Sequence, residues 1–126
     1  MIPDNVRRFI LTSIPSVPYL EAMLWLRAHP VEDHRAEDLA RALYLADDLA
    51  QDLLRSLAAS GVLSQTPGVE TPAFRFQPRD PDLVANIDAL AAAYAANLVE
   101  IARLVHDATH RNAHRFADAF KLRKDS

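Results

Sequence analysis

The sequence predicts a mainly α-helical protein that carries one short β-hairpin. Leucine and alanine recur at helical spacing through most of the 126 residues, whereas only two glycines occur. One glycine belongs to the turn signal Pro67-Gly68, and residues 74–77 after it alternate apolar and polar side chains, as a half-buried strand does. These observations favour several helices around one core, with a single hairpin between them.

Prolines divide the first thirty residues into two predicted helices. A short amphipathic helix follows Pro3, and Pro15 and Pro18 break the chain and favour the opening of a second helix. The second segment has a broad apolar surface, so we expect it to be the central core helix, with Trp25 buried. It should end before Pro30, because a residue that precedes proline is pushed out of the helical region.

Two short helices joined by a turn around Leu45 follow. Helical spacing predicts them in residues 36–45 and 47–60, and Gly61 stops the second one. Residues 62–77 should then form a two-stranded wing around Pro67-Gly68. Helix, short turn, helix and wing is the element order of a winged helix-turn-helix. The apolar positions that carry the helical spacing are Leu39, Ala40, Leu43, Leu49, Leu53, Leu54 and Leu57.

The longest predicted helix starts at Asp80 and Pro81, and neither proline nor glycine occurs after it begins. An apolar seam at steps of three and four residues runs along it for about three heptads. Because the rest of this small chain has little left to cover the seam, we expect a homodimer. The predicted dimerisation residues are Leu83, Ile87, Leu90, Tyr94, Leu98, Ile101 and Val105.

These elements predict two parts. Residues 1–79 form a winged helix-turn-helix domain with an N-terminal helix, and residues 80–126 form a helical dimerisation arm with a basic C-terminal tail.

Residues 43–63 resemble the helix-turn-helix and wing entry of winged-helix transcription regulators of the MarR and related types. The resemblance consists mostly of a pattern of leucines and alanines, with Ala46 at the cap position of the recognition helix. It implies a dimeric DNA-binding regulator that contacts DNA through the outward face of that helix, with Arg55 foremost, and through arginines of the wing. The candidate DNA-binding residues are Asp48, Gln51, Asp52, Arg55, Ser56, Arg75 and Arg79.

The predicted recognition helix is unusually acidic for that role. Residues 31–60 hold seven acids against three arginines, whereas residues 111–126 hold five bases against two acids, and the net charge is −3. Asp47 and Asp48 complement the helix dipole, but Asp52 lacks that reason and would repel phosphate. This favours an alternative, a winged-helix module that binds protein and not DNA. The basic tail could meet phosphate, pair with the acidic helix of a neighbouring subunit, or lie in solvent.

Composition excludes several classes of function. Without cysteine there is neither a disulfide nor a thiolate zinc site. Two glycines leave little material for phosphate-binding loops, and we find no enzyme motif and no cofactor site. The first residues do not resemble a signal peptide, and no apolar run approaches a membrane span. We therefore expect a non-enzymatic, cytoplasmic protein.

Two groups of histidines invite a metal interpretation. His29 and His34 flank an acidic loop that contains Glu32 and Asp33. These side chains are all local and lack a recognised ligand spacing, so a solvated turn is the preferred interpretation.

The second group lies near the C-terminus. In an unbroken helix His106, His110, His114 and Asp118 would share one stripe, but its ends would lie about 18 Å apart at ~1.5 Å per residue, too far for one ion. A polar, pH-sensitive face is the preferred interpretation, and Thr109 could interrupt the stripe by starting a new helix.

Overall fold

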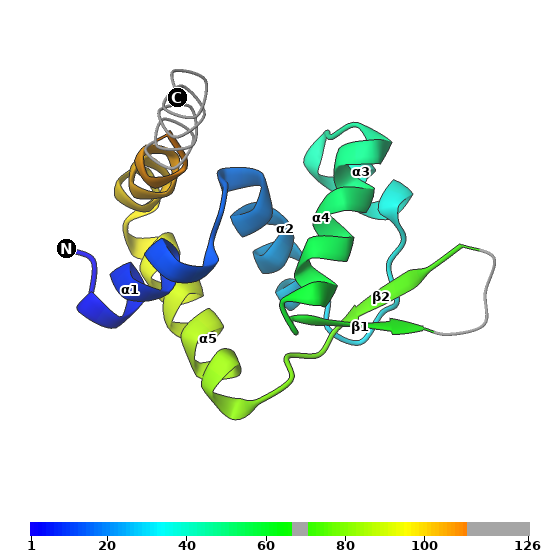
Figure 1. Cartoon of the computed structure of the whole chain (residues 1–126), viewed down its shortest axis with the longest axis horizontal. Helices are drawn as coiled ribbons and strands as arrows, with labels where there is room; N and C mark the ends of the chain where they lie inside the picture. Colours follow the sequence, from blue (N-terminus) through cyan, green and yellow to red (C-terminus); the bar gives the residue numbers. More distant parts are fainter. Residues whose placement is uncertain (67–70, 111–126) are drawn as a thin grey trace, which may run out of the picture. The chain divides into compact units, whose positions relative to one another are not determined.

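The computed structural model of the chain describes residues 1–66 and 71–110 (Figure 1). Its helices are α1 (Asp4–Ser13), α2 (Val17–Ala28), α3 (Ala36–Leu43), α4 (Asp47–Ala59) and α5 (Pro81–Ala96), and its strands are β1 (Leu63–Thr66) and β2 (Ala73–Phe76). A further helix covers Leu98–His110. This order confirms the predicted fold class, a mainly α winged helix-turn-helix with a two-stranded wing.

The chain forms two compact units. One unit is Pro18–Asp88, which contains α3, α4 and the wing. The other joins Met1–Val17 to the chain that begins at Ala89, and its described part contains α1 and the Leu98–His110 helix. The functional division into residues 1–79 and 80–126 stays a prediction.

The core of the Pro18–Asp88 unit is built from the apolar faces that the helical spacing predicted. There are three exceptions: Leu43 is half-buried, Leu49 is 39% exposed, and Trp25 is half-buried where we expected full burial. Its ring lies 4.7 Å from the ring of His29 and 4.6 Å from that of His34, between centroids, so polar rings flank it. The fully buried leucines of this core are Leu20, Leu26, Leu39, Leu54 and Leu57.

A buried tyrosine links α2 to the end of α4. Tyr19 is 4% exposed, and its side chain forms a hydrogen bond with the Ser60 side chain. Burial raises the pKa of the Tyr19 phenol, and the Ser60 hydrogen bond opposes part of that rise. The phenol is therefore neutral at physiological pH and serves as a structural contact.

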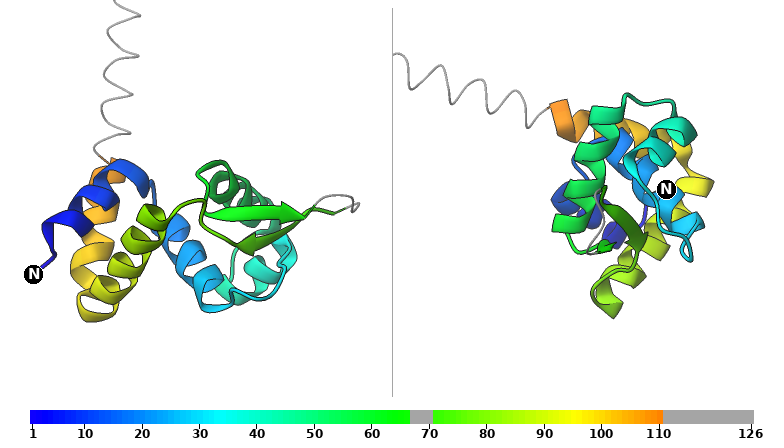
Figure 2. Two further views of the ribbon diagram at one scale, coloured as in Figure 1. Left: turned by 90° about the horizontal axis from the view of Figure 1, so that it is seen from below. Right: turned by 90° about the vertical axis from the view of Figure 1, so that its right-hand side faces the viewer.

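The wing is an antiparallel hairpin whose two strands lie side by side (Figure 2). Leu63 pairs with Phe76, and Thr66 pairs with Ala73. Phe74 is 1% exposed whereas Phe76 is half-buried, so the predicted inward face of this strand is only partly covered. The proposed turn at Pro67-Gly68 lies outside the described residues.

His34, which lies outside the hairpin, pairs with β2 on the edge opposite β1. The backbones of His34 and Phe74 exchange two hydrogen bonds of 2.7 Å each, which form an isolated antiparallel bridge. His34 is 4% exposed, so the solvated turn expected here is wrong at this residue. His34 is buried because its backbone N–H and C=O pair with those of Phe74. Phe74 is a buried strand residue, and its own backbone groups need hydrogen-bond partners.

Gly61 ends α4 as the sequence predicted. Its φ of +83° is left-handed, and the Val62 N–H donates to the Leu57 carbonyl over 3.0 Å, which closes the helix end. A Cβ built on Gly61 would lie 2.6 Å from Cδ of Arg79. The left-handed backbone conformation therefore favours glycine here, whereas the exposed side chain of Arg79 could move aside for a Cβ.

The predicted long helix is broken at Asn97, which corrects the sequence analysis. α5 ends at Ala96, and the Leu98–His110 helix is bent by 118° from it. The Asn97 carbonyl accepts from the Ile101 N–H over 3.0 Å, so Asn97 sits at the cap position of the second helix. Asparagine favours such positions, because its side chain competes with the helix for backbone groups.

The break divides the predicted dimerisation seam. Leu98 is 55% exposed, whereas four other members are fully buried within the single chain. The continuous apolar stripe that suggested a coiled-coil pairing is therefore absent, although a dimer itself stays a prediction. The four buried members are Ile87, Leu90, Ile101 and Val105.

No single helix among the described residues is long and apolar enough to cross a membrane. Two pairs of consecutive helices meet the length and composition limits when each pair is counted as one segment, but each pair is sharply bent.

We predict that Leu53→Ala lowers the free energy of unfolding by about 2–5 kcal/mol, because it removes a core side chain that is 7% exposed. The matched control is Leu49→Ala on the same helix, where the leucine is 39% exposed and the loss should be much smaller. Chemical denaturation of both variants measures the difference. Equal losses would mean that the inward face of α4 is wrongly placed.

Candidate nucleic-acid interface

The turn between α3 and α4 has the geometry of a helix-turn-helix. Tyr44 caps α3 in the left-handed region, with φ 57° and ψ 47°, and the Leu45 N–H donates to the Ala40 carbonyl over 2.9 Å. Ala46 then occupies the N-cap position of α4 in an extended conformation. Ala46 contributes no capping side chain, so the start of α4 depends on the acids of its first turn, Asp47 and Asp48.

The predicted recognition face of α4 is exposed with one exception. Asp48, Asp52, Arg55 and Ser56 are all exposed, whereas Gln51 is half-buried. The Gln51 amide nitrogen is buried and has no hydrogen-bond partner among the described residues. An unpaired buried donor is costly, and because this nitrogen is buried it is not presented to a partner on the surface of α4.

The charge of this face is negative. Asp47, Asp48 and Asp52 are exposed on α4, and Arg55 is the basic residue of that helix. Because Arg55 follows Asp52 by three residues, the two lie on neighbouring positions of the helix surface. Arg55 is therefore the side chain of this face that can attract phosphate or the acceptor edge of guanine.

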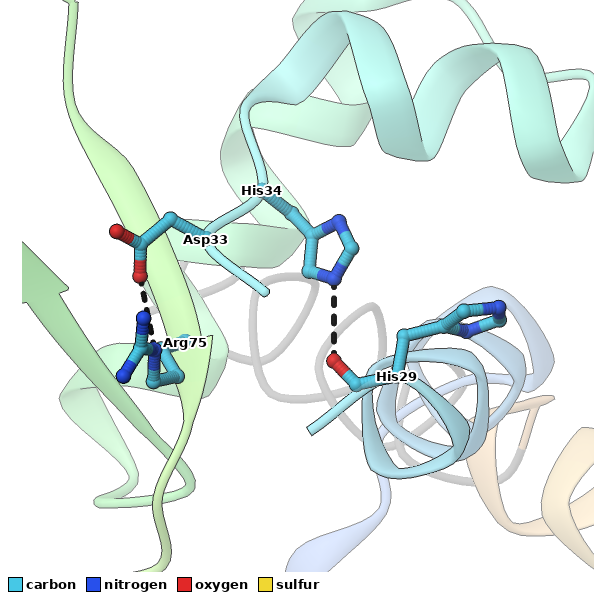
Figure 3. Close-up of polar contacts among 4 residues, drawn as sticks. All are labelled: His29, Asp33, His34 and Arg75. Atoms are coloured by element: carbon cyan, nitrogen blue, oxygen red, sulfur yellow. Dashed lines mark hydrogen bonds and ion pairs between the residues drawn. The ribbon is translucent and has the colours of Figure 1, made fainter. Parts of the chain in front are cut away.

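The two predicted wing arginines are each held by a carboxylate. Nε of Arg75 lies 3.0 Å from Oδ1 of Asp33, in the loop after α2 (Figure 3). Nε of Arg79 lies 3.4 Å from Oδ2 of Asp80. All four side chains are substantially exposed, and such pairs contribute only ~0–1 kcal/mol, so either arginine can exchange its carboxylate for a phosphate.

The histidines after α2 form a structural cluster. Nε2 of His34 donates to the His29 carbonyl over 3.2 Å (Figure 3). Nδ1 of His29 donates to the Trp25 carbonyl over 2.9 Å. These roles follow because a carbonyl only accepts. Within residues 1–66 and 71–110, no group of three or more His, Asp or Glu side chains is placed to hold a metal ion.

The C-terminal histidine stripe is described only in part. His106 and His110 are exposed on the Leu98–His110 helix, whereas His114 and Asp118 lie outside the described residues. Thr109 does not start a new helix, because the helix continues through it and its hydroxyl donates to the Val105 carbonyl over 2.8 Å.

The sequence did not lead us to expect that Tyr44 would be an exposed residue with a left-handed backbone. Its side chain is 95% exposed, and it is the non-glycine residue with positive φ among the described residues. A left-handed conformation costs a residue with a Cβ about 1–2 kcal/mol, and an exposed ring returns little of that by packing. The available signal was an aromatic residue at a tight interhelical turn, where glycine or asparagine is usual.

Comparison with known proteins supports the fold. No protein-family model and no curated protein sequence matches the chain. RV1404 from Mycobacterium tuberculosis is similar in structure, with a TM-score of 0.53 and 14% sequence identity over 75% of this chain and 67% of that one. A mutant of MepR from S. aureus, solved bound to an oligodeoxyribonucleotide, has a TM-score of 0.52 and 14% identity over 86% and 78%. A MarR family protein from Bacillus stearothermophilus has a TM-score of 0.48 and 18% identity over 89% and 82%.

The first two similarities establish the fold alone. The chain has the winged helix-turn-helix fold of these solved proteins, as the MarR-like resemblance of residues 43–63 implied.

We predict that Tyr44→Gly raises the stability of the protein by about 1 kcal/mol, because glycine adopts the left-handed conformation without steric cost. Tyr44→Ala is the control, since it also removes the ring but keeps a Cβ and should not stabilise. Thermal and chemical unfolding measure both variants. A glycine variant less stable than the wild type would show that the ring contributes to folding.

Proposed function

We propose that this chain is a dimeric winged-helix regulator that binds double-stranded DNA through α4 and the wing. The observation that carries the proposal is the exposed face of α4, presented by a helix-turn-helix and followed by a wing with two exposed arginines. A similar fold in the MepR mutant was solved bound to an oligodeoxyribonucleotide, which supports the same use of the fold here. The role is regulatory and non-enzymatic, and its place is the cytoplasm.

Each contact has a physical role in this proposal. Arg55 reads base edges or phosphate from the recognition helix, and Arg75 and Arg79 bind backbone phosphates from the wing. Tyr44 donates its phenolic O–H to a phosphate beside the start of α4. Asp48, Gln51, Asp52 and Ser56 face the groove, where a carboxylate accepts from cytosine N4 and disfavours other base edges.

The acidic face supports a second candidate, a winged-helix module that binds a protein. Asp47, Asp48 and Asp52 would repel phosphates, whereas they would attract a basic protein surface. Tyr44, at 95% exposure, and Leu49, at 39%, add apolar contact area of the kind found in protein interfaces.

The dimer is proposed to form through the unit that contains α1 and the Leu98–His110 helix. Leu11 is 50% exposed, Leu98 is 55% exposed and Val99 is 64% exposed, so this unit keeps large apolar side chains in solvent. Of the seam predicted from the sequence, Leu98 is the most exposed member, and Leu83 and Tyr94 are half-buried. Burial of Leu11, Leu98 and Val99 in a symmetric interface would remove that exposure.

We predict that Leu98→Asp converts the dimer to a folded monomer, because it places a charge in the apolar interface. Leu49→Asp is the control, since it makes the same change at an exposed leucine of the other unit. Light scattering gives the mass, and circular dichroism confirms folding. A wild-type protein that is monomeric at micromolar concentration would contradict the dimer.

We predict opposite effects of two neighbouring substitutions on DNA binding. Arg55→Ala should weaken binding by about 1–3 kcal/mol, whereas Asp52→Asn should strengthen non-specific binding because it removes repulsion of phosphate. Electrophoretic shifts on duplex DNA over a salt series measure both, and affinity should fall steeply as salt rises.

Arg103→Ala, at an exposed arginine of the Leu98–His110 helix, controls for the loss of one positive charge and should have little effect. If Arg55→Ala and Asp52→Asn both leave a weak DNA affinity unchanged, the protein-binding candidate replaces the first.

A further inference from the structure

The Pro18–Asp88 unit contains a pocket that the proposed DNA contacts do not use. It has a volume of about 530 Å³ and lies between the end of α2, the loop that follows it and α3. The pocket is a shallow depression that is open to solvent, so a ligand held there keeps part of its surface in water. Its lining comes from one compact unit, so its shape does not depend on a second subunit.

The aromatic part of the lining is the ring cluster around Trp25. The indole is half-buried, and the His29 and His34 rings lie 4.7 Å and 4.6 Å from it, between centroids. A tryptophan face attracts cations within about 6 Å more strongly than any other side-chain ring. The His29 and His34 rings are tilted by 34° and 63° to the indole, so the three rings do not form one flat surface, and the indole itself is the part that attracts a ligand that is both aromatic and positively charged.

The histidine hydrogen bonds decide what the two rings can offer a ligand. Nε2 of His34 and Nδ1 of His29 carry the protons that the backbone carbonyls accept. In the neutral rings, Nδ1 of His34 and Nε2 of His29 then carry the lone pairs. His34 is 4% exposed whereas His29 is half-buried, so Nε2 of His29 is the acceptor that this pair offers to the N–H groups of an ammonium.

The charged part of the lining is acidic. Glu32, Asp33 and Asp38 contribute three carboxylates, against the single guanidinium of Arg41. Asp38 accepts from the Arg35 backbone N–H over 2.9 Å, and Asp33 is paired with Arg75. Glu32 is exposed and forms no hydrogen bond or ion pair within residues 1–66 and 71–110, so its carboxylate is the one most available to a cation.

We infer that this pocket binds a small aromatic ammonium compound. The ring of the ligand lies against Trp25, and its ammonium donates to Glu32 and to Nε2 of His29. This inference goes beyond DNA binding and does not depend on it. Asp33 links the pocket to the wing, because a cation that attracts this carboxylate competes with Arg75 of β2 (Figure 3).

The test uses 2-phenylethylamine, which is an ammonium at neutral pH, and no DNA. Two probes of similar size act as controls: neutral 2-phenylethanol and anionic 3-phenylpropionate. Calorimetry measures affinity, and the fluorescence of Trp25 reports the location directly, because the chain has one tryptophan. We expect saturable binding of the amine with a change in Trp25 emission, and at least roughly fivefold weaker binding of both controls.

Two variants test the assignment of the carboxylates. Glu32→Gln should weaken binding of the amine by roughly twofold to fivefold, whereas Arg75→Gln should strengthen it because Asp33 loses its competing partner. Glu100→Gln, at an exposed glutamate of the other unit, should leave the affinity unchanged. Circular dichroism checks that each variant is folded.

Three results would overturn the inference. The first is that the amine shows no saturable binding below about 10 mM. The second is that 3-phenylpropionate binds as tightly as the amine. The third is that Glu32→Gln and Glu100→Gln change the affinity for the amine to the same extent. Because no DNA is present in the experiment, none of these results bears on the DNA-binding proposal, and loss of DNA binding in an electrophoretic shift would not affect the pocket.

Discussion

The position of the wing depends on two backbone hydrogen bonds between His34 and Phe74, each 2.7 Å long. A two-stranded hairpin is only marginally stable by itself, so β1 and β2 need support from the rest of the unit. Phe74 supplies that support on one side by full burial, and His34 supplies it on the other by pairing with the backbone of β2. The His34 side chain in turn donates to the carbonyl of His29, which ties the wing to the end of α2.

This anchor also sets the distribution of charge around the wing. The loop that delivers His34 to β2 delivers Asp33 to Arg75 as well, so a wing arginine is held by an acid before any partner arrives. On α4 the exposed acids Asp48 and Asp52 outnumber Arg55. Affinity for a polyanion at this surface is thus a balance between few cations and several nearby carboxylates. Such a surface disfavours partners that place negative charge against its carboxylates, because like charges in contact are costly.

Local strain and exposure coincide at Tyr44. The turn between α3 and α4 forces a left-handed backbone, and the residue that adopts it places an aromatic side chain in solvent. Backbone strain that the surrounding fold imposes clusters at functional sites, which is the reason for the phosphate contact proposed for Tyr44. Gly61 shows the opposite case, since there the same backbone region is occupied by the residue that adopts it freely.

The sequence alone determined the fold class, the helix-turn-helix and the exposed face of α4, because these follow from helical spacing, prolines and Gly61, which act over a few residues. It also placed Asp48, Asp52, Arg55 and Ser56 in solvent. The interruption at Asn97 was missed, because the apolar spacing continues across it and nothing local distinguishes a capping asparagine from one on a helix surface. Only the tertiary structure decided that Ile101 and Val105 are buried within the chain, that His34 is buried against the wing, and that Asp33 holds Arg75. These outcomes join residues some forty positions apart or depend on the direction of a helix after a bend, and a periodic pattern carries no information about either.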